Sequence, residues 1–278
     1  MKKAFDFFLF SSLYIALCAL LMIYQTCRLI MTTDVPLSLY LFVFFSTICS
    51  YNFHWWLSTN SVAKSDRVDW SKRHRNLQFF LFIAGAVGAG IVFVDIARYW
   101  LPIAFSVFLT FLYSAPKLPY KPFLFLRKIA VGKTIFLAMV WTYVTTVLPL
   151  LVSGQSWTGG MLLFCISRFM LIYAICIIFD YRDREDDRAD GIRSMITYFN
   201  DRGIDNLFAL SMILFLVSTV LLLWWAITPI QLLLLLVPGM IVVALYHYSK
   251  RHFSDYLYYF VLDGLMMLSS LLMLVLWI

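Results

Sequence analysis

Apolar runs follow one another along the whole chain and are separated by short polar breaks. As α-helices, which rise ~1.5 Å per residue, these runs are long enough to cross the ~30 Å hydrocarbon core of a membrane. Some breaks are tight turns, such as residues 32–36 and 153–155, whereas others are longer and rich in Lys and Arg. The pattern predicts about nine transmembrane helices. They are expected at residues 5–30, 36–59, 77–95, 98–114, 130–152, 160–180, 206–226, 229–248 and 256–277.

The runs leave no stretch for a separate soluble domain, so we expect one polytopic membrane domain over residues 1–278, an all-α membrane protein in class. Composition agrees, because 63% of the residues are hydrophobic and only 13% are charged, which excludes an ordinary water-soluble protein. The first run is longer than the apolar core of a signal peptide and has no small-residue cleavage site, so it is expected to remain as the first helix. The five cysteines form no CxxC pair and are expected to be reduced packing residues.

The positive charge falls mainly on one side of the predicted membrane. The formal net charge is +7, and most Lys and Arg residues lie in every second connection. The opposite side keeps only Arg28 and Arg98, so the positive-inside rule predicts that the N-terminus and the large basic loops face the cytoplasm. An odd number of helices then places Ile278 outside, in an integral protein of the inner or plasma membrane. This topology explains the charge, so no nucleic-acid partner is expected.

The basic connection from Ser58 to Asn76 has two interpretations. Its cations could fold over a site and bind a phosphorylated ligand. They could equally be a topology signal that contacts anionic membrane lipid. The sequence leaves both open.

Acidic residues gather just after the sixth predicted helix. If that helix continues past the membrane surface, Asp180, Asp183 and Asp187 lie at i, i+3 and i+7 on one face. Carboxylates in such a row repel one another unless a cation lies between them, and Mg²⁺ favours a few carboxylates together with waters and phosphate oxygens. The alternative is a solvated helix end whose acids pair with neighbouring arginines. The arginines that could bind an anionic substrate beside the row are Arg184, Arg188 and Arg193.

This acidic stretch resembles the second aspartate-rich motif of the UbiA superfamily of intramembrane prenyltransferases, with Asp183 and Asp187 as its DxxxD pair. Residues 191–194, Gly-Ile-Arg-Ser, fit the motif as well. The resemblance implies a bundle of nine transmembrane helices with cytosolic loops over the site. It also implies that the acid pair holds Mg²⁺ on the diphosphate of an isoprenyl donor, and that a lipophilic acceptor receives the prenyl group.

A second similarity lies at the end of the fourth predicted helix, where Tyr113-Ser-Ala-Pro-Lys117 is similar to the YxxxK element of that family. The resemblance implies that Tyr113 and Lys117 lie beside the leaving group and join the acid pair as catalytic residues. A lysine can hold a diphosphate as a point charge. The alternative for Lys117 is an ordinary lysine that extends toward the membrane surface.

The first motif of the family is altered in this chain. Its asparagine is present as Asn52, but the expected acids fall on Phe53, Trp56 and Asn60. Asn52, Trp56 and Asn60 would share one helix face at i, i+4 and i+8, where we expect them to contact substrate. Amide oxygens bind Mg²⁺ far more weakly than carboxylates do. Trp56 either faces the cavity, where its ring would stabilise an allylic cation, or packs at the membrane interface.

Two functions remain open at this point. The first is an Mg²⁺-dependent prenyltransferase that moves an isoprenyl group from its diphosphate to a lipophilic acceptor. The second is a non-catalytic protein of the same fold that binds a prenyl lipid or a partner, which the altered first motif favours. Arg168 and Asp263 are the charged residues deep in apolar runs. Each lies about 12 Å from its own membrane face, so they could form a buried pair.

Overall fold

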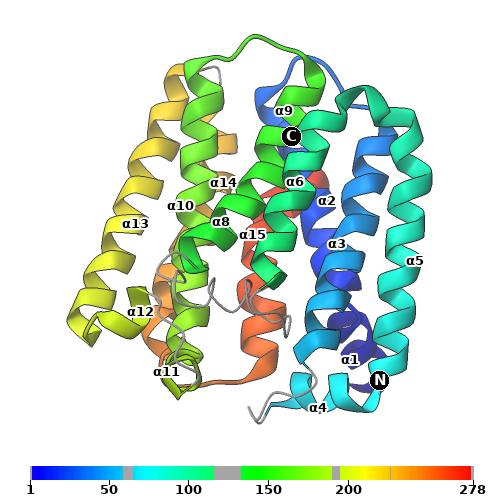
Figure 1. Ribbon diagram of the computed structural model, residues 1–278. Helices are drawn as coiled ribbons and strands as arrows, with labels where there is room; N and C mark the ends of the chain where they lie inside the picture. Colours follow the sequence, from blue (N-terminus) through cyan, green and yellow to red (C-terminus); the bar gives the residue numbers. More distant parts are fainter. Residues whose placement is uncertain (1, 59–64, 116–132, 190–194, 226, 277–278) are drawn as a thin grey trace.

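The computed structural model describes residues 2–58, 65–115, 133–189, 195–225 and 227–276, and these are helical with no β-strand among them (Figure 1). The prediction of an all-α membrane bundle is confirmed. The α-helices are α1 (Lys2–Phe10), α2 (Leu13–Ile30), α3 (Leu37–Leu57), α4 (Asp66–Arg73), α5 (Arg75–Phe93), α6 (Trp100–Ser114), α8 (Lys133–Thr142), α9 (Leu148–Ser153), α10 (Gly159–Arg182), α11 (Arg184–Ala189), α12 (Met195–Tyr198), α13 (Asp201–Leu221), α14 (Pro229–Ser249) and α15 (Asp263–Leu276).

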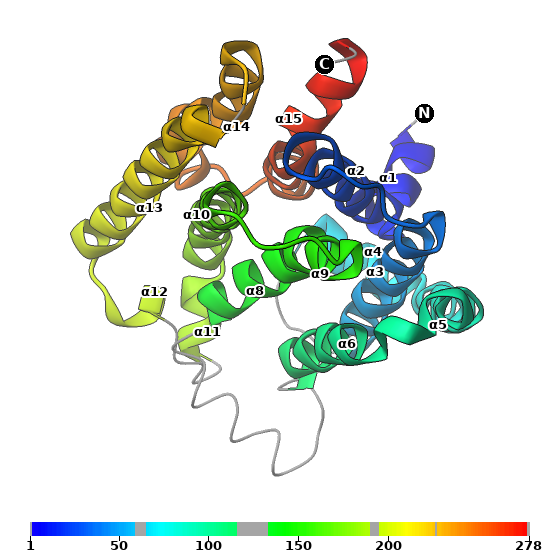
Figure 2. The same cartoon turned by 90° about the horizontal axis from the view of Figure 1, so that it is seen from above.

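The helices form one bundle. Viewed along it, α13 and α14 lie at one edge, α5 lies at the opposite edge, and α2, α10 and α15 lie between them (Figure 2). The short helices α4, α11 and α12 lie together at one end, which is the lower end in Figure 1 and is called the α4–α11 end below.

Seven segments of the described chain are long and apolar enough to cross a membrane, so the predicted number of nine is not confirmed. One of the seven, Arg75–Ser114, is 40 residues long and contains both α5 and α6. It turns back at η2 (Val94–Tyr99), where Ile96 leaves helical geometry with φ −114° and ψ 15°, and α5 and α6 therefore run antiparallel (Figure 1). The 21-residue apolar helix α3 lies outside the seven.

The first predicted helix, residues 5–30, is two helices in the structure. Between α1 and α2, Ser12 has a φ of 71°, in the left-handed region where a non-glycine residue costs roughly 1–2 kcal/mol. The break exposes the carbonyl oxygen of Ser11, which accepts a hydrogen bond of 3.0 Å from Nδ2 of Asn52 on α3. The break between α1 and α2 thus has a hydrogen bond from α3, and the apolar pattern alone does not predict this break.

Small residues bring α3 and α5 together. A Cβ added at Gly85 would lie 2.7 Å from the backbone nitrogen of Cys49, and one at Gly88 would lie 2.6 Å from the ring of Phe45. Close backbone approach of this kind is how helices pack tightly where lipid removes the hydrophobic driving force.

Two π-helical turns supply backbone acceptors to side chains of other helices. In η5 (Tyr143–Val147), between α8 and α9, the carbonyl oxygen of Thr145 accepts hydrogen bonds from Thr26 and Arg168. In η7 (Leu257–Leu262), just before α15, the carbonyl oxygen of Phe260 accepts one from Tyr14. π-turns leave carbonyl groups that the regular helical ladder does not use, and they are frequent at functional sites.

Arg168 is a buried cation in the middle of this bundle, and it is held without a carboxylate. Its guanidinium donates five hydrogen bonds of 2.6–3.0 Å to neutral oxygens. The acceptors are the carbonyl oxygens of Met22 and Thr145 and the side chains of Gln25, Thr26 and Thr146. The predicted pair with Asp263 is therefore wrong, because depth in the membrane does not determine which way a side chain faces around the bundle.

Candidate functional site

Three acids lie where α10 meets α11, at the α4–α11 end. Asp180 is in the last turn of α10, Asp183 joins the two helices, and Asp187 is in α11. Backbone hydrogen bonds continue through the junction, from the N–H of Asp183 to Phe179 (3.1 Å) and from the N–H of Asp187 to Asp183 (2.9 Å). Asp180 and Asp187 are buried, whereas the side chain of Asp183 is 38% exposed. The helical spacing that was predicted for these acids therefore persists.

The acids do not form a metal cage built from protein alone. Asp180 accepts a hydrogen bond from the Thr134 hydroxyl, and Asp183 accepts one of 2.7 Å from Nε of Arg182. Within the described residues, no three His, Cys, Asp or Glu side chains are grouped closely enough to hold a metal ion. Mg²⁺ commonly binds through only one or two carboxylates and completes its shell with waters and substrate phosphates. The donor set fits such a shared site.

Arg182 is a cation in direct contact with one of these acids. Besides Asp183, it donates to the Tyr259 hydroxyl at 3.1 Å, and its guanidinium lies 4.5 Å from the centroid of the Tyr258 ring. Its Nη1 is buried and makes no hydrogen bond to the described residues, and a carboxylate oxygen of Asp255 lies 4.0 Å away. Sequence analysis counted Arg182 only as a topological charge, although its place inside the acid motif was a signal.

Arg67 is a second buried cation at the same end, supplied by α4. It is 3% exposed and donates to the carbonyl oxygen of Leu9 at 3.2 Å. Its guanidinium lies 4.4 Å from the centroid of the Trp55 ring and 5.6 Å from that of Tyr259. Burial lowers the pKa of Arg67 to about 10, so the side chain remains positive at neutral pH. Part of the basic connection thus does fold against the bundle.

Asp255 links the two arginines. Its Oδ2 accepts a hydrogen bond of 2.7 Å from the backbone N–H of Arg67, and its Oδ1 is the oxygen that faces Arg182. Burial raises the pKa of Asp255 above its usual value, although both contacts oppose this. One carboxylate thus contacts the backbone of Arg67 and lies beside the guanidinium of Arg182, which joins α4 to the end of α10.

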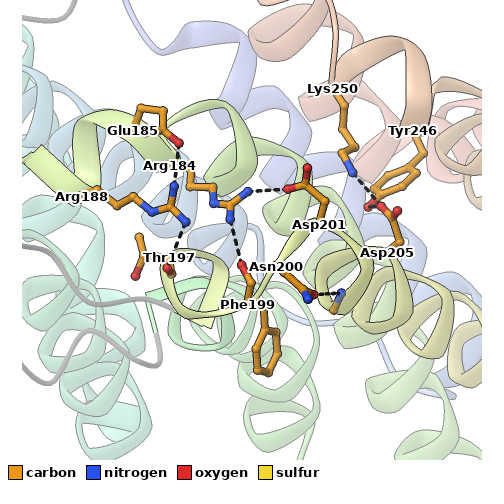
Figure 3. A network of polar contacts seen from close by, with 11 residues as sticks. Arg184, Glu185, Arg188, Thr197, Phe199, Asn200, Asp201, Asp205, Tyr246 and Lys250 are labelled. Carbon is orange, nitrogen blue, oxygen red and sulfur yellow. Dashed lines mark hydrogen bonds and ion pairs between the residues drawn. The ribbon is translucent and has the colours of Figure 1, made fainter.

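Arg184 and Arg188 instead hold the chain that leads into α13 (Figure 3). Arg184 donates to Asp201 at 2.6 Å and to the carbonyl oxygen of Phe199 at 2.9 Å. Arg188 pairs with Glu185, one turn back in α11, at 2.8 Å. Neither is brought to Asp183 by these contacts, and Arg193 lies outside the described residues.

Residues 73–271 match the family model described as the UbiA prenyltransferase family. The chain belongs to this family. The matched residues include the second aspartate-rich motif and Tyr113, so this UbiA-family chain is a membrane protein of the prenyltransferase type. Comparisons with curated proteins and with solved structures give no match.

The match begins after the altered first motif, whose residues face different neighbours. Asn52 is fully buried, and its Nδ2 donates to the carbonyl oxygens of Ser11 and Ile48, whereas its Oδ1 makes no hydrogen bond to the described residues. Trp56 stacks on Phe53 and lies 5.3 Å from the guanidinium of Arg75, next to α5. The third residue, Asn60, lies outside the described residues.

Of the UbiA-type YxxxK element, the structure describes residues 113–115. Tyr113, near the end of α6, stacks on His54 with a ring separation of 5.1 Å, and Nδ1 of His54 lies 3.4 Å from the hydroxyl of Ser114. Lys117 lies outside the described residues.

Proposed function

We propose that this protein is an Mg²⁺-dependent intramembrane prenyltransferase that moves an isoprenyl group from its diphosphate to a lipophilic acceptor. The observation that supports this most is the convergence at the α4–α11 end. Acids of the second motif lie there beside Arg182, with the buried cation Arg67 close by. A diphosphate and its counter-ion require that combination of carboxylates and cations.

The residues have separate roles in this proposal. Asp183 and Asp187, with Asp180 as a third ligand, hold Mg²⁺, which neutralises charge on the departing diphosphate. Arg182 and Lys117 bind the diphosphate oxygens, and Tyr113 lies beside the leaving group. The bond between the prenyl carbon and the diphosphate oxygen breaks, and its electron pair leaves with the diphosphate. The prenyl carbon then bonds to a nucleophilic atom of the acceptor, and the acceptor loses one proton, which leaves with the diphosphate or to water.

The proposal includes an orientation. The α4–α11 end faces the cytoplasm, together with the N-terminus and the large basic loops, and the C-terminus faces outward from the inner or plasma membrane. Single cysteines placed at Gln155 and at Arg188 in a cysteine-free chain test it with a membrane-impermeant thiol reagent on intact cells. We expect labelling at 155 and protection at 188, and the reverse pattern would overturn the orientation.

Calorimetric titration with geranylgeranyl thiodiphosphate, with and without Mg²⁺, tests the function. We expect binding that requires Mg²⁺, and we expect Asp187→Asn to weaken it at least about tenfold, because a full charge is lost beside the cation. The matched control is Asp34→Asn, which removes an exposed acid elsewhere in the chain. Identical weak heats in all conditions, unchanged by Asp187→Asn, would contradict the proposal.

The second candidate is a non-catalytic member that binds a prenyl lipid or a partner. It is favoured by the altered first motif, where the Asn52 amide binds Ser11 and Trp56 packs beside α5. This candidate predicts no Mg²⁺-dependent diphosphate binding in any variant. The enzyme predicts that Asn60→Asp keeps or raises turnover, because it returns an acid to the first motif.

A further inference from the structure

A small cavity lies beside Arg168, among the helices α2, α10 and α15 that occupy the middle of the bundle (Figure 2). Its volume is about 20 Å³, and the residues that line it are all buried. Along α10, Arg168 precedes Arg182 by roughly 21 Å at ~1.5 Å per residue. The cavity is therefore separate from the acids and cations of the α4–α11 end.

The guanidinium of Arg168 does not use all of its donors on the protein. Four of its hydrogen bonds come from Nη1, whose two N–H groups are shared among four acceptors, and the fifth runs from Nη2 to Gln25. Its Nε makes no hydrogen bond within the described chain and keeps accessible surface, and Arg168 borders the cavity. A guanidinium carries five N–H groups, so the Nε–H group and one N–H group of Nη2 remain for a ligand.

Gln25 of α2 joins Arg168 to Ser269 of α15 at the wall of this cavity. Its Oε1 accepts a hydrogen bond of 2.7 Å from Nη2 of Arg168, and its Nε2 donates one of 2.9 Å to Oγ of Ser269. Ser269 lines the cavity, and its own hydroxyl proton has no acceptor in the described part of the chain. Arg168 is 6% exposed and Ser269 is 3% exposed. Two buried side chains from different helices thus offer hydrogen-bond donors at one small cavity.

No described carboxylate forms an ion pair with Arg168. The ion pairs among the described residues all belong to other cations, which are Arg182, Arg184, Arg188 and Lys250. A buried charge is costly unless an opposite charge accompanies it. A water molecule in the cavity would use the remaining donors but leave the charge, whereas an anion would use the donors and also balance the charge.

The size of the cavity limits which anion can enter. A volume of about 20 Å³ accommodates about one water-sized group, so a phosphate, a carboxylate or a lipid chain is too large. Apolar side chains form most of the remaining wall, among them Leu171, Phe215 and Leu235. A weakly hydrated monatomic anion loses less hydration free energy on entering such a site than a strongly hydrated anion does.

We propose that this cavity binds a chloride ion, which accepts hydrogen bonds from Nε of Arg168 and from the hydroxyl of Ser269. The ion balances the charge of Arg168 and joins α10 to α15, and Gln25 of α2 holds both donors in place. Chloride is a structural ligand in this site, so the proposal goes beyond prenyl transfer and does not depend on it.

Thermal unfolding in detergent tests the site, with sodium chloride and sodium bromide replacing sodium gluconate at constant ionic strength. At a halide concentration ten times the Kd, the unliganded fraction of the folded protein falls about elevenfold, so we expect the Tm to rise by roughly 3–5 °C. Ser269→Ala should raise the halide concentration needed for this rise at least about tenfold, because a hydrogen bond to a charged ligand is lost. The matched control is Ser270→Ala, which should keep the wild-type response, because Ser270 is buried in the same helix but does not line the cavity.

Anomalous diffraction from crystals grown in sodium bromide locates the ion directly. We expect a bromide peak between Nε of Arg168 and Oγ of Ser269. A water at that position without a bromide peak, or an equal response of the Tm to halide in the wild type and in Ser269→Ala, would overturn the proposal. Asp187→Asn changes a group at the α4–α11 end and should keep the halide response, so the chloride site and the proposed diphosphate site are tested independently.

Discussion

Two arginines inside this bundle, the buried Arg168 and the partly buried Arg182, are held in opposite ways. Arg168 donates five hydrogen bonds to neutral oxygens from α2 and η5, and a cavity of about 20 Å³ next to it is large enough for about one water molecule. Arg182 instead bonds to Asp183 and Tyr259 and lies against aromatic rings, and its Nη1 lacks a hydrogen-bond partner among the described residues. The protein surrounds the Arg168 guanidinium with acceptors, whereas Nη1 of Arg182 has no acceptor among the described residues.

In the proposed function, this difference separates a structural cation, Arg168, from a cation that binds the diphosphate, Arg182. A guanidinium group carries five N–H donors, and a buried donor that finds no acceptor costs about 1–3 kcal/mol. Around Arg168 the fold supplies hydrogen-bond acceptors, including the carbonyl oxygen of Thr145 in the π-helical turn η5. The side chain therefore joins α10 to α2 and η5. Around Arg182 it supplies ring faces, which attract a cation without using its donors. In the proposed function, a diphosphate oxygen accepts a hydrogen bond from the remaining donor, Nη1 of Arg182.

The largest effect is expected from Arg168→Met, which keeps volume but removes every donor. Five hydrogen bonds from the guanidinium are lost, and at about 0.6 kcal/mol per hydrogen bond inside a membrane bundle the loss is about 3 kcal/mol. The apparent Tm in detergent should fall by roughly 6–12 °C. The control is Arg28→Met, because Arg28 is exposed. A drop in Tm no larger than that of Arg28→Met would show that the five hydrogen bonds do not hold the helices together.

Arg182→Met should act on binding rather than on stability. Mg²⁺-dependent binding of geranylgeranyl thiodiphosphate should weaken at least about tenfold, or about 1.4 kcal/mol, because a donor aimed at the diphosphate is lost. Arg184→Met, two residues along, removes an arginine that is engaged by Asp201 and Phe199, and we expect it to change binding less than about twofold. Equal losses in the two variants would remove the distinction between Arg182 and its neighbour.

Local patterns predicted the features of the fold that depend on nearby residues. The apolar runs predicted helices, and the break between predicted helices 77–95 and 98–114 falls at η2, where Asp95 and Arg98 interrupt the run. The break at Ser12 was missed, because a pair of serines within an apolar run is compatible with a continuous helix. Its stabilising contact comes from Asn52, 41 positions away along the chain.

The same limit applies to the candidate site. The spacing of Asp180, Asp183 and Asp187 was sufficient to place them along one helical segment, because i, i+3 and i+7 are local relations. The direction of Arg184 depends on where α13 begins, and the importance of Arg182 depends on Tyr259 from the far end of the chain. Such contacts are set by tertiary packing, which no local pattern encodes.

Removing one hydrogen-bond acceptor from each arginine should affect stability at Arg168 and diphosphate binding at Arg182. Thr146→Val removes one acceptor of Arg168 and should lower stability by about 0.6 kcal/mol, with unchanged diphosphate binding. Tyr259→Phe removes one acceptor of Arg182 and should alter diphosphate binding by about threefold, with little change in Tm. Thermal unfolding and calorimetry on both variants give the comparison. A stability loss in Tyr259→Phe larger than that in Thr146→Val would place Arg182 among the structural cations.

The smallest effect is expected at Asp255, whose carboxylate lies between Arg67 and Arg182. Burial raises the pKa of this group in the folded protein. The folded state therefore holds the proton more tightly than the unfolded chain does, so the contribution of Asp255 to stability is greatest at low pH and is lost as the pH rises through the folded pKa. In Asp255→Asn the amide oxygen can still accept the hydrogen bond from the N–H of Arg67, but nothing titrates. Between about pH 4.5 and about pH 7 the Tm of the wild type should therefore fall by about 2 °C relative to that of the variant. A relative rise in the wild-type Tm over the same interval would mean that the two arginines outweigh burial, and that their positive charge is already neutralised before an anion binds.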